Sequence, residues 1–386
     1  MSRRTVLGVI GAGNGAFEVA ARRIPQHASR SFSSTAHRNA TQITHFTPTS
    51  SPELDTTLST IREKIILPSY LTLAQRKKIL SPKWAKKLQA DPITIEIDGE
   101  IFKFRYMNPL SGEIPNTRKA VVDAIEKFDG ESDEDFKNLR PLLEGIYKTG
   151  RRMDDDFYTK VLRIVGSKGR TFELVELARG CKKTGFKLNT SEKVNEVLHF
   201  IQMSALESGW NKSETEQALR WAEVVVEMTE DKAHAPLAKS EGDLPLSRDP
   251  QVLMAPLHLV AALVVKSGAS DEKLVAKANK LASTIVKLWP AGQGLKKLHS
   301  LRSYVDKYQM RYLLEPNKFV ALTSPLLHGL KLASQVVTEP GLAAELQARA
   351  EALQSEITGA IDGGVKNGRN RRSSIVQEKF FGGEDA

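Results

Sequence analysis

Hydrophobic and polar residues alternate most regularly over residues 93–106, which read ITIEIDGEIFKFRY. Two alternating runs flank an Asp-Gly pair, a dipeptide that favours the two-residue turn of a β-hairpin because it tolerates positive φ. Pairing across that turn places Ile95 opposite Phe102 and Ile93 opposite Phe104, so one face is apolar and aromatic. Since an isolated hairpin is marginal in water, we expect this face to pack on a core; stacking on nucleic-acid bases is the alternative.

From Asn116 onward the apolar residues recur at helical spacing, and the pattern predicts helices in pairs of similar length. The expected pairs are 154–166 with 171–183, 191–208 with 213–229, 251–267 with 271–288, and 317–337 with 340–361, with a basic connecting helix around 294–312. Pairs that bury their faces against neighbouring pairs are typical of an α-solenoid. The predicted fold is therefore mainly α, a helical-hairpin (α-solenoid-like) array preceded by a small β-hairpin module.

One stretch of this array, FYTKVLRIVGSKGRTFELVELARGCKKTGFKLN, resembles a single pentatricopeptide unit. Tyr158 and Leu162 fall at apolar places of its first helix, and Leu174 and Leu177 at those of its second. The resemblance covers about thirty-three residues of one repeat. A plain helical scaffold is the favoured interpretation, and a sequence-specific RNA reader is the alternative.

Composition shifts divide the chain into seven segments. We expect a transit peptide over 1–32, a flexible segment over 33–60, a basic segment with the hairpin over 61–115, a helical repeat block over 116–231, a linker over 232–250, a second helical block over 251–362 and a disordered basic tail over 363–386.

The N-terminal stretch contains GAGNGA, in which Gly11, Gly13 and Ala16 fit the spacing of a dinucleotide-binding turn. That turn needs a second strand and an acidic residue about twenty positions on, and neither is present. Instead the first fifty residues hold six arginines, no lysine and one acid, Glu18, with many serines. This composition predicts a mitochondrial transit peptide, a mature chain that starts near Ser33, and a location in the mitochondrial matrix.

Charge and composition narrow the class of function. The net charge is +10, and half of it lies in the first fifty residues. One cysteine, Cys181, excludes an internal disulfide and a multi-cysteine zinc site. No run of eighteen apolar residues is present, so we expect no membrane span. Metalloprotease, P-loop and nucleophile-elbow motifs are absent, and we expect no catalytic residues, no metal, no cofactor and no small-molecule substrate; an enzyme with a dispersed site is a third alternative.

Basic residues concentrate in residues 61–90, which hold eight bases and one acid. A segment without interleaved acids attracts the phosphate backbone, whereas a solvated helix face mixes both signs. We expect RNA contacts from this segment, from a second patch and from the tail. The candidate residues are Arg76, Lys77, Lys78, Lys83, Lys86 and Lys87, then Lys182 and Lys183, then Arg369, Arg371 and Arg372.

The order of these parts, with LPSYL, a basic helix, a hairpin that ends in FKFRYMNPL, and then helices, resembles mitochondrion-specific large-subunit ribosomal proteins of fungi. The resemblance covers about residues 60–230. It implies a structural component of the mitochondrial ribosome, with mitochondrial rRNA and other mitochondrial ribosomal proteins as partners. A pentatricopeptide-type factor for mitochondrial RNA processing or translation is the alternative function.

Overall fold

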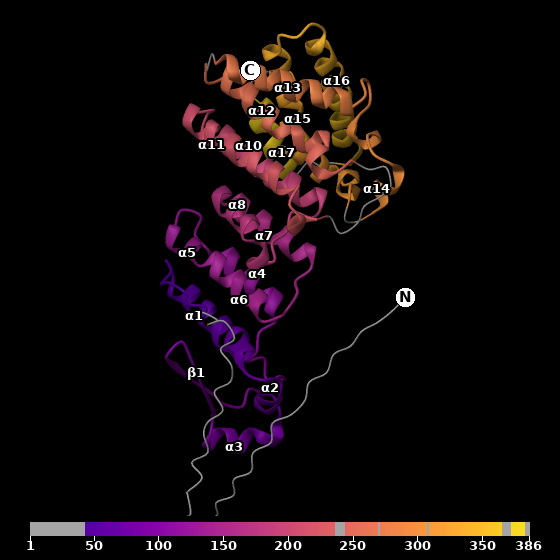
Figure 1. Cartoon of the computed structure of the whole chain (residues 1–386). Helices are drawn as coiled ribbons and strands as arrows, with labels where there is room; N and C mark the ends of the chain where they lie inside the picture. Colours follow the sequence, from indigo (N-terminus) through magenta and orange to yellow (C-terminus); the bar gives the residue numbers. More distant parts are fainter. Residues whose placement is uncertain (1–42, 236–243, 269–270, 307–308, 365–371, 383–386) are drawn as a thin grey trace, which may run out of the picture. The chain divides into compact units, whose positions relative to one another are not determined.

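The computed structural model describes residues 43–235, 244–268, 271–306, 309–364 and 372–382. In these residues the chain is mainly helical, with one two-stranded antiparallel sheet (Figure 1). The predicted fold class is confirmed. The transit peptide expected over 1–32 lies outside the described residues.

The sheet is the predicted hairpin. Strand β1 covers Ile93–Ile97 and β2 covers Glu100–Phe104, with Ile95 opposite Phe102 and Ile93 opposite Phe104 as expected. Asp98 and Gly99 take φ of 52° and 82°, the left-handed conformation that this turn requires.

The hairpin packs on three short helices to form a unit that we call the hairpin module, residues 67–107. These are α2 (Leu73–Ile79), the 3₁₀ turn η3 (Pro82–Trp84) and α3 (Ala85–Ala90). The module has a small core of its own, in which half-buried hairpin residues lie against buried side chains. The buried side chains are Leu67, Leu71, Ile79, Leu88, Phe104 and Met107 of the module and Ile43, which packs on it from an earlier part of the chain. The apolar hairpin face therefore serves core packing, the favoured of the two interpretations.

Residues 43–60 differ from the flexible segment expected over 33–60. Helix α1 (Pro52–Ile61) buries Leu54, Leu58 and Ile61 and packs on α4 (Thr117–Lys127). Ahead of it, Ser50 donates two hydrogen bonds to the Asp135 carboxylate, at 2.7 and 2.8 Å. Ser50 thus bonds a residue 85 positions along the chain, a contact that local composition does not show. A π-turn, η1 (Arg62–Ile66), and a 3₁₀ turn, η2 (Leu67–Tyr70), continue α1.

The predicted helix pairs are present, with small shifts at their ends. Two short helices, α5 (Asp133–Lys137) and α6 (Leu139–Lys148), precede them. The pairs are α7 (Asp155–Ser167) with α8 (Thr171–Arg179), α10 (Ser191–Glu207) with α11 (Lys212–Met228), α12 (Pro250–Val265) with α13 (Glu272–Leu288), and α15 (Pro316–Val336) with α16 (Leu342–Gly364). A separate turn of helix, α9 (Cys181–Thr184), follows α8.

One hydrophobic core runs through both blocks that were expected on either side of residues 232–250. Helix α12 is apolar on all sides and is buried because it lies between α10, α11, α13 and α15. Helix α15 packs in turn on α16 and on α17 (Arg372–Phe381), as Figure 1 shows for this end of the chain. Within the expected linker, two 3₁₀ turns are described, η4 (Lys232–His234) and η5 (Leu246–Arg248).

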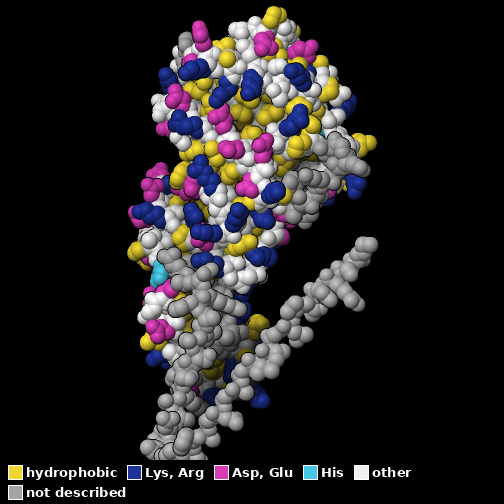
Figure 2. Space-filling model, viewed as in Figure 1, with side chains coloured by type: hydrophobic (Ala, Val, Ile, Leu, Met, Phe, Trp, Pro, Cys, Tyr) yellow, Lys and Arg dark blue, Asp and Glu magenta, His cyan; other side chains and the backbone are white. Residues whose placement is uncertain are grey.

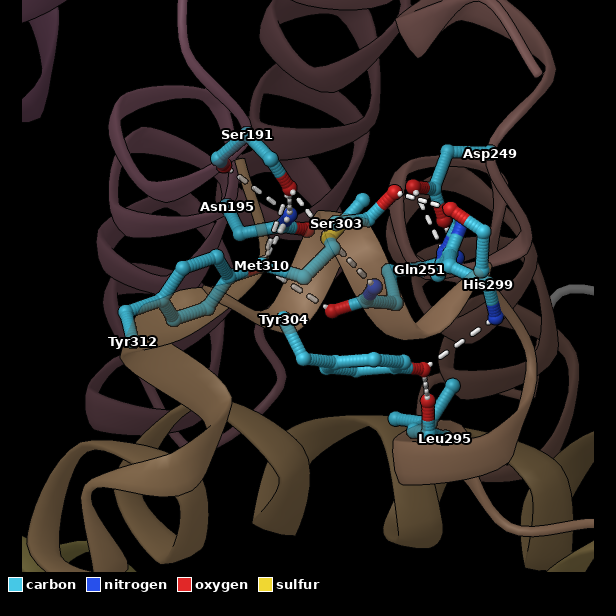
Figure 3. Close-up of polar contacts among 11 residues, drawn as sticks. Ser191, Asn195, Asp249, Gln251, Leu295, His299, Ser303, Tyr304, Met310 and Tyr312 are labelled. Atoms are coloured by element: carbon cyan, nitrogen blue, oxygen red, sulfur yellow. Dashed lines mark hydrogen bonds and ion pairs between the residues drawn. The ribbon is translucent and has the colours of Figure 1, made fainter. Parts of the chain in front are cut away.

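The prediction of one basic helix around residues 294–312 is wrong. The described residues there form three short pieces, η6 (Leu295–Lys297), α14 (Leu301–Val305) and η7 (Arg311–Leu314). Tyr304 and Tyr312 are buried and use their hydroxyls in a polar network (Figure 3). Tyr304 donates to the carbonyl of Leu295, and Tyr312 bonds Ser191 at 3.0 Å and donates to Gln251 at 3.1 Å. These contacts hold the segment against the N-terminal ends of α10 and α12, and a straight helix cannot make them.

The tail also differs from the disordered segment expected over 363–386. Residues 372–381 form helix α17 (Arg372–Phe381), which buries Val376 and Phe380 against Met203 of α10 and Ala321 of α15. Because these two apolar side chains are buried against other helices of the same chain, this part of the tail folds without a partner.

Candidate nucleic-acid interface

Local sequence places the first basic cluster at the C-terminal end of α2. Thr72 caps this helix through a capping box with Gln75, which fixes where the helix begins. Arg76, Lys77 and Lys78 then fall in its last turn, where positive charge suits the helix dipole. Lys77 and Lys78 are exposed, and Arg76 is half-buried. Ile79, the next residue, anchors the helix in the core of the hairpin module.

The second half of the cluster surrounds Trp84, the last residue of η3. The ammonium of Lys78 is 5.0 Å from the centre of the indole ring and that of Lys87 is 5.6 Å from it. Both are cation–π contacts. They fix two of the charges on a rigid aromatic surface and leave Lys83 and Lys86 exposed beside it.

The basic cluster lacks acidic partners in the described part of the chain. No carboxylate there lies within 4.0 Å of the charged nitrogens of its six members, Arg76, Lys77, Lys78, Lys83, Lys86 and Lys87. Many bases elsewhere are paired. Lys127 lies 2.6 Å from Glu53, and Arg118 lies 2.7 Å from Asp154. On the face drawn in Figure 2, basic and acidic side chains are interspersed over the helical body. The cluster is therefore a positive patch without local compensation.

The other candidate residues lie apart from this cluster in the sequence. Lys182 and Lys183 are exposed on α9, which packs on α6. Arg369 and Arg371 lie outside the described residues. Arg372 opens α17, and its guanidinium pairs with the buried Glu196, so its charge serves an internal contact.

Comparison with known proteins identifies the family. The model of a family described as mitochondrial ribosomal protein mS27 (Mrp13) matches residues 30–378. A curated relative from Neurospora crassa, small ribosomal subunit protein mS27, is 36% identical over 350 residues, which is 86% of this chain and 88% of the relative. The chain belongs to the mitochondrial ribosomal protein mS27 family. It is a mitochondrial ribosomal protein and is located in the mitochondrial matrix.

Membership of the mS27 family confirms the expected organelle and particle and corrects the subunit. The resemblance pointed to the large subunit, and the Neurospora relative is a small-subunit protein. The resemblance was carried by a basic helix and a hairpin that ends in FKFRYMNPL, and it led us to expect contact with rRNA. They hold nothing that distinguishes the RNA of one subunit from that of the other, and this is why the subunit was wrong.

The mS27 family is one of structural ribosomal proteins. In the described ranges, no three His, Cys, Asp or Glu side chains gather as metal ligands, and no helix there is both long and apolar enough to cross a membrane.

The buried Asp249 and His299, whose Oδ2 and Nε2 atoms are 3.3 Å apart, belong to the network of Figure 3. Asp249 caps α12 through the amide of Gln251, so this pair ties residues 295–304 to that helix.

Two further exposed bases, Arg151 and Arg152, were not among the predicted contact residues. They follow Gly150, which ends α6 in the left-handed conformation with φ of 79°. The guanidinium of Arg152 lies 4.2 Å from the centre of the Tyr147 ring. In the sequence these arginines belong to KTGRR, a short basic run across the end of a helix. This run is much shorter than the basic segment 61–90, so it did not stand out.

Proposed function

We propose that this chain is a structural component of the small subunit of the mitochondrial ribosome and that the hairpin module binds its rRNA. The observation that carries the proposal is the cluster of six bases on α2, η3 and α3 without acidic partners. A rigid module that presents uncompensated positive charge suits phosphate contacts, which position a protein without reading sequence. Membership of the mS27 family and the name of the Neurospora relative support the subunit.

The remaining helices have a different role in this proposal. Their acids and bases are interspersed on the face seen in Figure 2, and many of the bases are paired. Such a surface suits contacts with neighbouring ribosomal proteins better than a long RNA path. Lys182 and Lys183 form a second, smaller RNA contact at the junction with α6.

A free pentatricopeptide-type factor is not favoured, because the match to the mS27 family spans residues 30–378 and the resemblance to a pentatricopeptide unit covers one pair, α7 with α8.

Fractionation of mitochondrial extract on a sucrose gradient tests the proposed function. After a high-salt wash, we expect the chain to migrate with the small ribosomal subunit in one copy per particle. Migration with the large subunit, or recovery mainly as free or sub-stoichiometric protein, would contradict the proposal.

A further inference from the structure

Helix α14 has its polar and apolar residues on the sides opposite to those usual for a surface helix. Ser303 and Tyr304 are buried and belong to the network of Figure 3, in which the Tyr304 hydroxyl donates to the carbonyl of Leu295. Leu301 and Val305 are four positions apart, so they share one face of the helix. They are 85% and 75% exposed. A surface helix ordinarily buries such side chains and exposes the polar ones.

A third exposed apolar side chain belongs to the 3₁₀ turn η7, which packs on α14. The backbone amide of Met310, just before η7, donates to the carbonyl of Ser303 at 2.9 Å and holds the two elements together. Leu314 at the end of η7 is 55% exposed, whereas its neighbour Leu313 is fully buried. Apolar side chains that gather in solvent on fixed elements are typical of a contact with another molecule.

The two arginines of these elements have no acidic partner. Arg302 and Arg311 are exposed, and no carboxylate in the described part of the chain lies within 4.0 Å of their charged nitrogens. The acids at the ends of the two elements are already engaged, since Asp306 is half-buried and has a partner and Glu315 pairs with Lys318 at 2.9 Å. The exposed side of these elements, which we call the α14–η7 surface, is therefore apolar and positive. It consists of Leu301, Arg302, Val305, Arg311 and Leu314.

The aliphatic side chains decide between RNA and protein as the partner of the α14–η7 surface. Phosphate groups can pair with the arginines, but they leave leucine and valine in contact with water, and RNA bases stack on aromatic rings. The basic cluster of the hairpin module offers Trp84 beside its lysines, whereas Tyr304 and Tyr312 are buried beneath the α14–η7 surface. An apolar centre with arginines beside it is the arrangement found in protein–protein interfaces.

We propose that the α14–η7 surface binds an acidic amphipathic segment of a neighbouring ribosomal protein in the small subunit. The apolar side chains of that segment cover the three exposed aliphatic residues, and its carboxylates pair with the two arginines. This inference rests on the proposed function and adds the place and the chemistry of one protein contact to it. The polar contacts of Ser303 and Tyr304 hold α14 in place before the partner binds, so little conformational entropy is lost on binding.

A photo-crosslinker tests the contact in assembled small subunits. Benzoylphenylalanine replaces Leu301 in a full chain that is the only copy in the cell, and mass spectrometry identifies the crosslinked molecule after the particles are isolated and irradiated. We expect crosslinks to one ribosomal protein, within a segment that is rich in acidic and apolar residues. Crosslinks to rRNA alone, or no crosslink, would overturn the inference.

Two double variants test the apolar and the charged parts separately. Leu301→Asp with Val305→Asp removes the apolar contact, and Arg302→Glu with Arg311→Glu reverses the charge. All four side chains are exposed, so both variants should melt close to the wild-type temperature. Each variant chain should leave salt-washed small subunits about tenfold faster than the wild-type chain.

Each double variant has a matched control. Leu301→Met with Val305→Ile keeps the surface apolar. Lys212→Glu with Arg220→Glu reverses two exposed bases of α11, neither of which pairs with an acid in the described residues. Both controls should leave the subunit at the wild-type rate. Release of the test variants at the rate of their controls would overturn the inference.

Exchange of charge with the partner completes the test. Changing the partner's acids in the crosslinked segment to lysine should slow the release of the Arg302→Glu, Arg311→Glu variant, because opposite charges then face each other again. If the wild-type chain is absent from small subunits, the proposed function and this inference are both contradicted. If the chain is present in one copy and the test variants are retained like the wild type, the contact is wrong and the proposed function stands.

Discussion

Arg372 forms a two-pronged ion pair with Glu196, which lies 176 positions earlier in the middle of α10. Nη1 is 2.9 Å from Oε1 and Nη2 is 2.6 Å from Oε2. The Glu196 side chain is fully buried and also accepts from Arg163 at 2.8 Å. A buried carboxylate is stable only when positive partners compensate its charge. The pairing of Arg372 with Glu196 in turn fixes where α17 begins.

Arg372→Gln should therefore destabilise the protein by about 3 to 5 kcal/mol, because it leaves Glu196 buried with one of its two guanidinium partners removed. The guanidinium also lies 5.0 Å from the centre of the Phe200 ring, so packing is lost as well. Urea unfolding followed by circular dichroism measures the change. Hydrogen exchange should show α17 more exposed than α16.

Lys379→Gln is the control for the ion pair at the other end of α17. Lys379 pairs with Glu207 at 2.6 Å, and both side chains are more than two-fifths exposed. Exposed pairs contribute about 0 to 1 kcal/mol, so this variant should unfold close to the wild type. An equal loss of unfolding free energy in Arg372→Gln and Lys379→Gln would show that the burial of Glu196 does not decide the position of α17.

Glu196 also predicts a loss of stability in acid. Burial raises its pKa, but the charges and hydrogen bonds of Arg372 and Arg163 outweigh burial and bring it to about 2, from an ordinary 4.5. A carboxyl whose pKa is lower in the folded state stabilises the protein above pH 4.5, and this contribution is lost as the pH falls toward 2. The contribution is on the order of 3 kcal/mol. The difference in unfolding free energy between the wild type and Glu196→Gln should shrink over this pH range; a constant difference would contradict the assignment.

The His258–His328 pair titrates in a higher range. His258 Nε2 and His328 Nδ1 are 2.8 Å apart, and Gln202 bonds the other ring nitrogen of His258 at 2.9 Å. Both histidines are buried, and Trp210 stacks on His328. This chain of hydrogen bonds suits neutral rings, in which one nitrogen donates and the other accepts. Burial and then the charges of Lys266 and Lys331 lower the pKa of His328 to about 4.

A histidine whose pKa is lower in the folded state takes up its proton first in the unfolded chain. Stability should therefore fall as the pH decreases from 6.5 to 4, by on the order of 3 kcal/mol for His328. His328→Gln should flatten this part of the curve whatever its effect at pH 7.5. Urea titrations at pH 7.5, 6.5, 5.5 and 4.5 measure it. An unchanged slope in the variant would mean that His328 titrates equally in both states.

Sequence predicted the elements whose information is local. The hairpin depends on alternation and one Asp-Gly turn, and its register was correct to the residue. The helix pairs follow from apolar periodicity within each helix. In both cases the residues that decide the structure lie within twenty positions of one another, so a short window holds the signal.

The parts that sequence reasoning missed depend on distant partners. Tyr312 is buried because Ser191 and Gln251 accept or donate at its hydroxyl, 121 and 61 positions away. In the sequence, Arg372 looks like one more base of a basic tail, and only the structure shows that it pairs with Glu196. Such pairs become visible only when the fold brings their elements together.

Gly329 gives a test of how closely α15 crosses α12. A Cβ at Gly329 would lie 2.6 Å from the Cβ of His258. Gly329→Ala should destabilise the protein by about 1 to 3 kcal/mol through overpacking, because two helix backbones would have to separate. Gly359→Ala in α16 is the control, since nothing lies within 4 Å of its Cβ position. This control should stabilise the chain by up to about 1 kcal/mol, since alanine favours a helix. Similar effects of both substitutions would contradict the close crossing.

The basic cluster of the hairpin module gives the last prediction. Changing Arg76, Lys77, Lys78, Lys83, Lys86 and Lys87 together to Gln should leave the helical fold intact, because the five lysines are exposed and exposed charges contribute little to stability. The half-buried Arg76 has no ion-pair partner within the described residues, so its replacement breaks no salt bridge there. Circular dichroism and the melting temperature check this. RNA affinity should fall, and the log–log salt slope should become smaller by about four to five units, at roughly 0.7 to 0.9 per phosphate contact.

A control variant separates the position of the charges from their number. It changes six bases of the helical body that already pair with acids, so the net charge falls equally. These are Arg118, Lys127, Lys137, Arg140, Lys160 and Arg179. Because their charge is compensated locally, their loss should reduce affinity much less than the loss of the unpaired cluster. Equal weakening by both variants would show that RNA responds to net charge alone, and the hairpin module would then have no special part in binding it.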